Sequence, residues 1–170
     1  MVTGHEFQRR LRKMCRDLGV DPNELCGVLQ MRYEYPAEIQ RDEGSFWLVT
    51  FPDVPEAATD ARDRGQALAE APGALSAALA GYVHARRPLP EPSPAAGRPV
   101  VAVPGIVAAK LALYEAMRER GMFTAGELAE VLGKSPTAAR RLMDPDHSSK
   151  WENIEEALAR LGHRLIIEAA

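Results

Sequence analysis

Residues 35–61 read YPAEIQRDEGSFWLVTFPDVPEAATDA, and this stretch predicts a β-hairpin whose two strands differ. In the first strand Tyr35, Ala37 and Ile39 alternate with polar residues, which is the period-two pattern of a strand with one solvent-exposed face. The polar segment RDEGS follows and contains Gly44, and its length suits a hairpin loop. The sequence therefore predicts an antiparallel pair closed by a short turn.

The second predicted strand is apolar on both of its faces. Its inner face continues the pattern of the first strand, with Trp47, Val49 and Phe51. Its opposite face carries no charge and consists of Phe46, Leu48 and Thr50. We expect a helix to cover the inner face, and a partner protein or another subunit to cover the other, because exposed apolar patches mark interaction sites.

The composition places the chain among globular proteins. With 46% hydrophobic and 26% charged residues in 170, it has room for one ordinary domain or two small ones. No apolar run approaches the roughly 18 residues of a membrane span, and the N-terminal MVTGHEFQRRLRKM lacks the apolar core of a signal peptide. We therefore expect a cytoplasmic protein that does not enter the membrane.

The residues that carry catalysis or bind metals form no recognisable pattern. Cys15 and Cys26 have no histidines at zinc-site spacing, so neither a metal nor a cofactor is expected. The acidic residues at positions 42, 43, 53 and 60 fall in predicted turns and do not pair into an acid/base or two-metal site. The sequence predicts no catalytic residue and no enzyme activity.

Four segments follow one another along the chain. Residues 1–30 predict one amphipathic helix, and residues 31–86 predict an α+β layer that contains the hairpin, a short third strand near residues 56–60 and an alanine-rich helix. Pro72 and Gly73 predict a kink or a split in that helix. Residues 87–104 contain six prolines and predict an extended linker. Residues 105–170 predict helices, with LIIEA at the end as a possible short strand.

The stretch FTAGELAEVLGKSPTAARRLM, residues 123–143, predicts two short helices joined by a tight turn. Thr124 and Glu127 form a capping-box pattern, and Gly133 is a helix stop. Ser135 followed by Pro136 starts a second helix. This spacing is typical of a helix-turn-helix, in which the second helix enters the major groove of DNA, although a helical hairpin with surface charges has the same pattern.

The candidate DNA-binding residues lie on the outer side of the second helix and around it. They are Lys134, Ser135, Thr137, Ala138, Arg140 and Arg141, with Ser148, Ser149 and Lys150 in the following loop. A plain loop without phosphate contacts is an equal alternative for the last three. Arginine reads guanine with two hydrogen bonds, and hydroxyl and ammonium groups bind phosphate. Flanking helices supply core residues: Lys110, Leu111, Tyr114 and Met117 before the pair, and Trp151, Ile154, Leu158 and Leu161 after it.

The order of these motifs resembles the HicB antitoxin family over residues 33–167. YPAEI, a glycine-bearing turn, VTFPDVPEAAT, an alanine-rich helix, PLPEPS and a C-terminal helix-turn-helix occur in the family's order. The resemblance implies a partial ribonuclease H-like βββαβ fold without nuclease activity. It also implies neutralisation of a small HicA-type toxin ribonuclease and repression of the shared operon.

Three origins remain open for residues 1–30. EFQRRLRKMCRDLGV resembles the first helix of a HicA toxin, but no Gly-Ser-His block follows it. The segment is a toxin relic, an untranslated region before a start at Met31, or an unrelated surface helix. In each case we expect no ribonuclease activity from His5.

The sequence leaves a rival function open. A transcription regulator with a ligand-sensing or assembly domain, and without a toxin partner, would have the same two parts. For either function, two-fold operators favour a homodimer or a higher homo-oligomer bound to operator DNA.

Overall fold

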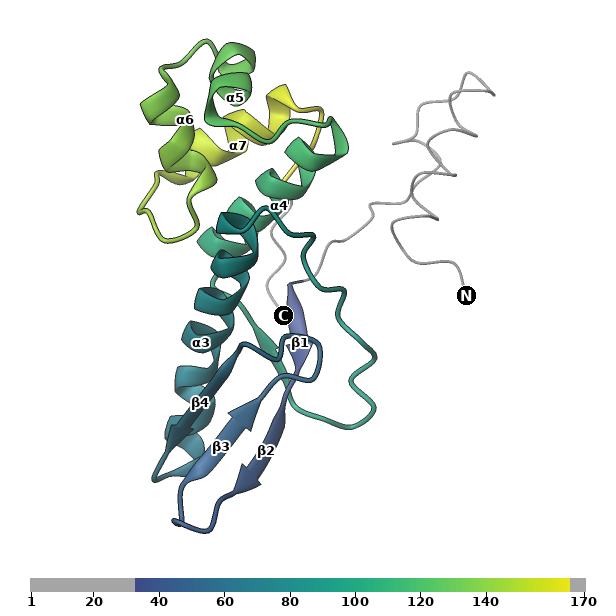
Figure 1. Cartoon of the computed structure of the whole chain (residues 1–170), viewed down its shortest axis with the longest axis vertical. Helices are drawn as coiled ribbons and strands as arrows, with labels where there is room; N and C mark the ends of the chain where they lie inside the picture. Colours follow the sequence, from purple (N-terminus) through teal and green to yellow (C-terminus); the bar gives the residue numbers. More distant parts are fainter. Residues whose placement is uncertain (1–32, 166–170) are drawn as a thin grey trace, which may run out of the picture. The chain divides into compact units, whose positions relative to one another are not determined.

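A long helix packs against one face of a small antiparallel sheet in the first half of the protein (Figure 1). The structure is a computed structural model and describes residues 33–165. The elements of this layer are β1 (Glu34–Pro36), β2 (Glu38–Arg41), β3 (Trp47–Thr50), β4 (Ala58–Ala61), α3 (Arg64–His84) and β5 (Val100–Ala102). The expected mixed α+β class is confirmed. The family resemblance implied three strands before the helix and one after it, whereas here β1 and β2 are separate strands, so four strands precede α3 and β5 follows it.

The strands form two antiparallel ladders. In the first, β1 pairs with β5, with Tyr35 opposite Val101. In the second, β3 lies between β2 and β4, and Val49 faces both Ile39 and Thr59. The short third strand predicted near residues 56–60 corresponds to β4, which begins at Ala58.

The hairpin loop between β2 and β3 is closed by Asp42 rather than by its glycine. The Asp42 carboxylate accepts a hydrogen bond from the Phe46 N–H at 2.6 Å, and the Asp42 N–H donates to the Phe46 carbonyl at 2.9 Å. Ser45, not Gly44, adopts the left-handed backbone, with φ of 67°. Short polar side chains tolerate such positions in turns because they bond locally to the backbone.

The helix α3 runs without a break from Arg64 to His84, so of the kink or split expected at Pro72 the split is wrong. A proline inside a helix removes one backbone donor. Here the Ser76 hydroxyl donates to the Pro72 carbonyl at 2.6 Å. Leu75 and Leu79, both fully buried, anchor the turns that follow. Their burial against the sheet outweighs the loss of one helical hydrogen bond.

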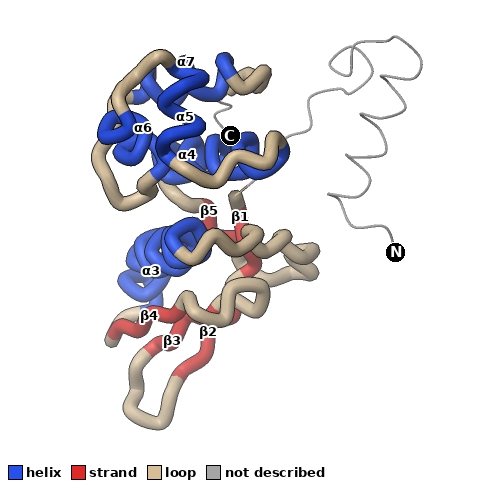
Figure 2. The backbone as a smooth tube through the Cα atoms, turned by 45° about the horizontal axis from the view of Figure 1, so that its top comes forward, coloured by secondary structure: helices blue, strands red, loops and turns tan. Residues whose placement is uncertain are grey.

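The second half of the described chain is helical (Figure 2). Its elements are α4 (Gly105–Glu119), α5 (Ala125–Leu132), α6 (Pro136–Met143) and α7 (Trp151–Arg160). The helix α4 belongs to two cores. Leu111 and Tyr114 are buried with the sheet and α3, whereas Leu113 and Met117 are buried with α5, α6 and α7. In the described residues, α4 therefore contributes side chains to both hydrophobic clusters.

The proline-rich residues 87–104 also add to the first core. Leu89, Val101 and Val103 are buried there, and the Tyr35 hydroxyl donates to the Pro90 carbonyl at 2.8 Å. Burial raises the pKa of the Tyr35 hydroxyl, and neighbouring carboxylates add to this rise. The segment thus packs against the layer while it connects α3 to α4.

Some sequence-based expectations fall outside the described residues. These are the helix and the toxin-like segment within residues 1–30, and nearly all of the possible strand LIIEA. Among the helices that are described, none has the length and hydropathy required to span a bilayer.

Substitution of Leu75 by alanine is expected to lower the free energy of unfolding by about 2–5 kcal/mol, because Leu75 is fully buried between α3 and the sheet. Leu48→Ala is the matched control, since Leu48 is only half-buried on the opposite face of β3. Chemical denaturation measures both values. Equal losses for the two variants would contradict this assignment of the core.

Candidate nucleic-acid interface

Helix α5 begins with a complete capping box. The Thr124 hydroxyl oxygen accepts a hydrogen bond from the Glu127 N–H, and the Glu127 carboxylate accepts one from the Thr124 N–H at 2.7 Å. The Thr124 hydroxyl and the Phe123 and Thr124 N–H groups all lower the pKa of the Glu127 carboxyl. These contacts fix where α5 starts, as the sequence predicts.

The turn from α5 to α6 is set by a glycine and a serine. Gly133 ends α5 in the left-handed conformation, with φ of 62°, which a residue without a side chain adopts at little cost. Ser135 then caps α6 by accepting a hydrogen bond from the Ala138 N–H at 3.2 Å, and Pro136 occupies the first turn. Leu128, Leu132, Ala139 and Leu142 are buried between the two helices and their neighbours. The predicted pair of short helices with a tight turn is confirmed.

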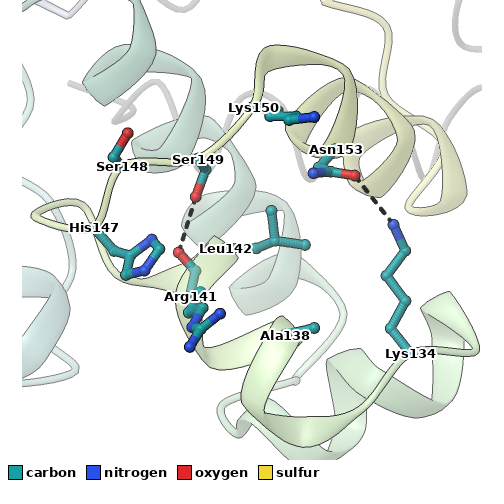
Figure 3. A pocket seen from close by; sticks show the side chains of 9 residues that line it. All are labelled: Lys134, Ala138, Arg141, Leu142, His147, Ser148, Ser149, Lys150 and Asn153. Atoms are coloured by element: carbon teal, nitrogen blue, oxygen red, sulfur yellow. Dashed lines mark hydrogen bonds between the residues drawn. The ribbon is translucent and has the colours of Figure 1, made fainter.

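A groove of about 290 Å³ lies between α6, the loop after it and the start of α7 (Figure 3). Its lining residues are Lys134, Ala138, Arg141, Leu142, His147, Ser148, Ser149, Lys150 and Asn153. Leu142 is buried, whereas Arg141 and Lys150 are exposed. The groove therefore combines apolar surface with basic side chains that remain in contact with solvent.

The structure brings most of the predicted DNA-binding residues to this groove, and three lie beside it. Ser135, the N-cap of α6, and Thr137 and Arg140 on α6 are exposed but do not line the groove. Ser148 is exposed, while the half-buried Ser149 donates its hydroxyl to the Arg141 carbonyl at 3.2 Å. Ser149 thus ties the loop to α6.

Lys134 is already paired within the protein. Its Nζ lies 2.6 Å from Glu156 Oε2 and 3.4 Å from Asn153 Oδ1, both on α7. The ammonium of Lys134 lowers the pKa of the Glu156 carboxyl through this hydrogen bond and through its charge. The turn between α5 and α6 is therefore connected to α7 by an ion pair.

Lys110 has a role that the sequence did not indicate. It lies on α4 with its side chain fully buried. Its ammonium donates hydrogen bonds to the carbonyls of Arg141 at 3.1 Å, Asp144 at 2.6 Å and His147. Burial lowers the pKa of Lys110, and the carboxylates of Asp144 and Asp146 oppose that effect. The ammonium thus holds the end of α6 and the following loop.

His84, the last residue of α3, reaches the same loop. Its Nε2 lies 3.3 Å from Asp144 Oδ1 and 3.9 Å from Asp146 Oδ2. Among the described residues, these three side chains form the group whose geometry could hold a metal ion. Their side chains are 40–65% exposed, and the Lys110 ammonium already supplies positive charge to both carboxylates. We therefore interpret the group as a polar contact between α3 and the loop and not as a metal site.

Sequence reasoning missed Asn153, His147, Glu156 and His84 as neighbours of the groove. A lysine inside the apolar run AAKLALY was the available signal for Lys110, because a lysine among buried positions requires polar partners. Neither Glu156 nor His84 carried a comparable signal, since charged residues on helix surfaces are ordinary.

The surface predicted to bind a partner protein is the outer face of β3 in the sheet layer. Phe46, Leu48 and Thr50 are half-buried, and in the described part of the chain none of them belongs to the core beneath β3. The Arg62 guanidinium lies 5.6 Å from the centre of the Phe46 ring. The outer face of β3 itself carries no charge, while Arg62 lies beside Phe46, and Gln40 and Asp60 stand opposite Leu48 on the neighbouring strands.

Comparison with known proteins assigns the chain to a family. Residues 34–112 match the model of the HicB-like antitoxins of bacterial toxin-antitoxin systems. Antitoxin HicB 2 of Photorhabdus laumondii is 40% identical over 135 residues, which cover 79% of this chain and 95% of that protein. The chain belongs to the HicB antitoxin family. Antitoxin HicB of Pseudomonas fluorescens is 36% identical over 142 residues, covering 81% and 96% of the two chains. Antitoxin HicB of Escherichia coli K12 is 30% identical over 132 residues, covering 77% and 95%.

Membership of the HicB family makes the protein an antitoxin and not an enzyme, as expected from its sequence. An antitoxin has a toxin as its partner. The matched residues 34–112 include the whole sheet, α3 and the first turns of α4. The three relatives extend this similarity over about four-fifths of the chain.

Substitution of Lys110 by methionine is expected to lower the free energy of unfolding by about 1–3 kcal/mol, because methionine fills the space but removes a donor from three backbone carbonyls. The Arg141 carbonyl keeps the Ser149 hydroxyl as a donor and the Asp144 carbonyl keeps the His147 N–H, so the loss falls mainly on the His147 carbonyl. Lys150→Met, at an exposed position, is the control and should change stability by less than about 0.5 kcal/mol. Urea denaturation tests this difference. A Lys110→Met protein as stable as the control would mean that the ammonium is not needed.

Proposed function

We propose that this HicB-family antitoxin neutralises a HicA-type ribonuclease toxin and represses its own operon by binding operator DNA. In this proposal α5 and α6 form a helix-turn-helix, and α6 enters the major groove. The observation that carries the proposal is the position of the basic groove. It opens beside the exposed, capped start of α6, where a recognition helix meets DNA.

The exposed side chains of α6 suit base recognition. Thr137, Arg140 and Arg141 all project from α6 into solvent, and Ala138 lies between them at the groove. An arginine donates two hydrogen bonds to guanine in the major groove, and alanine or a threonine methyl contacts thymine. Four side chains of these types on one short helix can distinguish a sequence.

The loop and the start of α7 suit phosphate binding. Ser148 and Lys150 are exposed, and α7 has no side-chain cap at its N-terminus. Phosphates bind at helix N-termini because the backbone N–H groups there have no partner within the helix. Contacts of this kind would set the orientation of α6 on the duplex without reading its sequence.

Two copies of the protein would be required for a two-fold operator. A dimer of the helical parts would place the two α6 helices in successive major grooves, about 34 Å apart or a multiple of that distance. The homodimer or higher oligomer is thus part of the proposal for DNA binding.

The outer face of β3 is the proposed contact for the toxin or for a second antitoxin subunit. Phe46 and Leu48 are half-buried and lie outside the core, on a sheet face that would carry polar side chains if it were only exposed to solvent. An apolar partner surface would remove them from water. The basic Arg62 beside Phe46 would favour acidic groups at the edge of that partner.

Replacement of both Arg140 and Arg141 by alanine is expected to weaken binding to the protein's own upstream DNA at least about 10-fold, because each lost base or phosphate contact costs roughly 1–3 kcal/mol. Titration of labelled upstream DNA at several salt concentrations measures the effect. Arg64→Ala, on the exposed start of α3, removes a charge far from α6 in the sequence and serves as the control.

If the Arg140/Arg141 double variant kept full sequence-specific binding, the proposal that α6 is the recognition helix would be contradicted. Absence of specific binding by the wild-type protein at low salt would mean that α5 and α6 are a helical hairpin without a role in DNA recognition.

Replacement of Phe46 and Leu48 by glutamate is expected to abolish assembly with a HicA-type toxin or to lower the oligomeric state, because each buried charge would lack a partner. Co-purification and light scattering measure the two outcomes. Val100→Glu, which charges an apolar residue that is 49% exposed elsewhere, is the control. If both assemblies survive the double substitution, this face is not the contact.

A further inference from the structure

The ion pair between Lys134 and Glu156 lies at the edge of the basic groove. Lys134 stands in the turn between α5 and α6, where its N–H donates to the Ala129 carbonyl at 3.0 Å. Its side chain reaches α7 and meets Glu156 at 2.6 Å and Asn153 at 3.4 Å. In Figure 3 the Lys134 side chain extends along the groove toward Asn153. The backbone of Lys134 is therefore fixed, while its charge is held by α7.

The position of this pair has a consequence for DNA binding. Lys134, Arg141 and Lys150 all line the groove with cationic side chains. No ion pair of Arg141 or Lys150 is found among the described residues, whereas Lys134 is paired with Glu156. A phosphate that approached Lys134 would have to compete with a carboxylate already in contact with it. The Glu156 carboxylate thus occupies the position beside the Lys134 ammonium that a DNA phosphate would take.

We propose that Glu156 sets the sequence-independent part of the affinity for DNA by withholding the charge of Lys134 from the phosphate backbone. This inference rests on the proposed binding of DNA by α6. Glu156 is a positioning residue in this role, because it acts through Lys134 and does not itself contact DNA. A net charge of −3 already limits non-specific binding by the chain, and the ion pair limits it further at the DNA-facing surface.

The energetics favour an exchangeable contact. The side chains of Lys134 and Glu156 are 27% and 43% exposed, so the pair is partly screened by water and contributes little to folding. Once the carboxylate at position 156 is removed, the Lys134 side chain can therefore turn to a phosphate without unfolding the turn. Each new phosphate contact releases counterions from DNA and steepens the dependence of affinity on salt.

The test uses Glu156→Gln in the full chain, with Glu155→Gln as the matched control. Both substitutions remove one negative charge from adjacent positions of α7, but in the described residues no ion pair involves Glu155. Kd is measured for the upstream DNA and for an unrelated duplex of equal length, across a range of salt concentrations. Circular dichroism checks that each variant is folded.

Glu156→Gln is expected to tighten Kd for both duplexes about 3- to 10-fold relative to Glu155→Gln at about 0.1 M salt, and to steepen the salt slope by about 0.9 per bound subunit. The ratio of specific to non-specific affinity stays the same, because a phosphate contact carries no sequence information. The gain in affinity requires Lys134. When Glu156→Gln is added to a Lys134→Gln protein, it is expected to change Kd no more than Glu155→Gln does.

Equal Kd and slope for Glu156→Gln and Glu155→Gln would overturn the inference, as would a gain that persists without Lys134. The proposed function is tested separately by the wild-type protein. Wild-type preference for upstream DNA with no effect of Glu156 would overturn the inference alone. A gain on both duplexes without any preference for upstream DNA would overturn operator recognition alone. No binding by any variant would overturn both.

Discussion

The buried ammonium of Lys110 fixes the end of α6 and the loop after it, because it donates hydrogen bonds to three backbone carbonyls there. Those carbonyls lie where a helix ends and its last C=O groups lack intrahelical partners. A single side chain from α4 supplies a donor to each of them, in addition to the Ser149 hydroxyl at the Arg141 carbonyl and the His147 N–H at the Asp144 carbonyl. Asp144 and Asp146 then offset the cost of burying its charge. The groove between α6 and α7 depends on this arrangement.

The same helix joins the two cores of the antitoxin. Tyr114 of α4 donates its hydroxyl to the Arg87 carbonyl just after α3, and His84 at the end of α3 contacts Asp144 beside α6. The sheet layer and the helical part therefore meet through hydrogen bonds as well as apolar contacts.

Local chemistry explains which features could be predicted from the sequence. The caps at Thr124 and Ser135, the stop at Gly133 and the alternation around Val49 depend on a few neighbouring residues, so the helix pair and the hairpin were predicted correctly. The continuity of α3 through Pro72 depends on burial against the sheet, which the local pattern does not contain. The contacts of Lys110 and Glu156 join residues about 20–40 positions apart, and no spacing rule anticipates them.

Amide hydrogen exchange of the full chain, with and without its upstream DNA, tests the central claim most directly. The account predicts slower exchange on DNA binding in residues 134–153, which contain α6, the loop held by Lys110 and the start of α7. It predicts unchanged exchange in β2, β3 and β4. Protection confined to the sheet, or absent from residues 134–153 while the DNA is bound, would contradict the assignment of α6 and its groove as the DNA-binding surface.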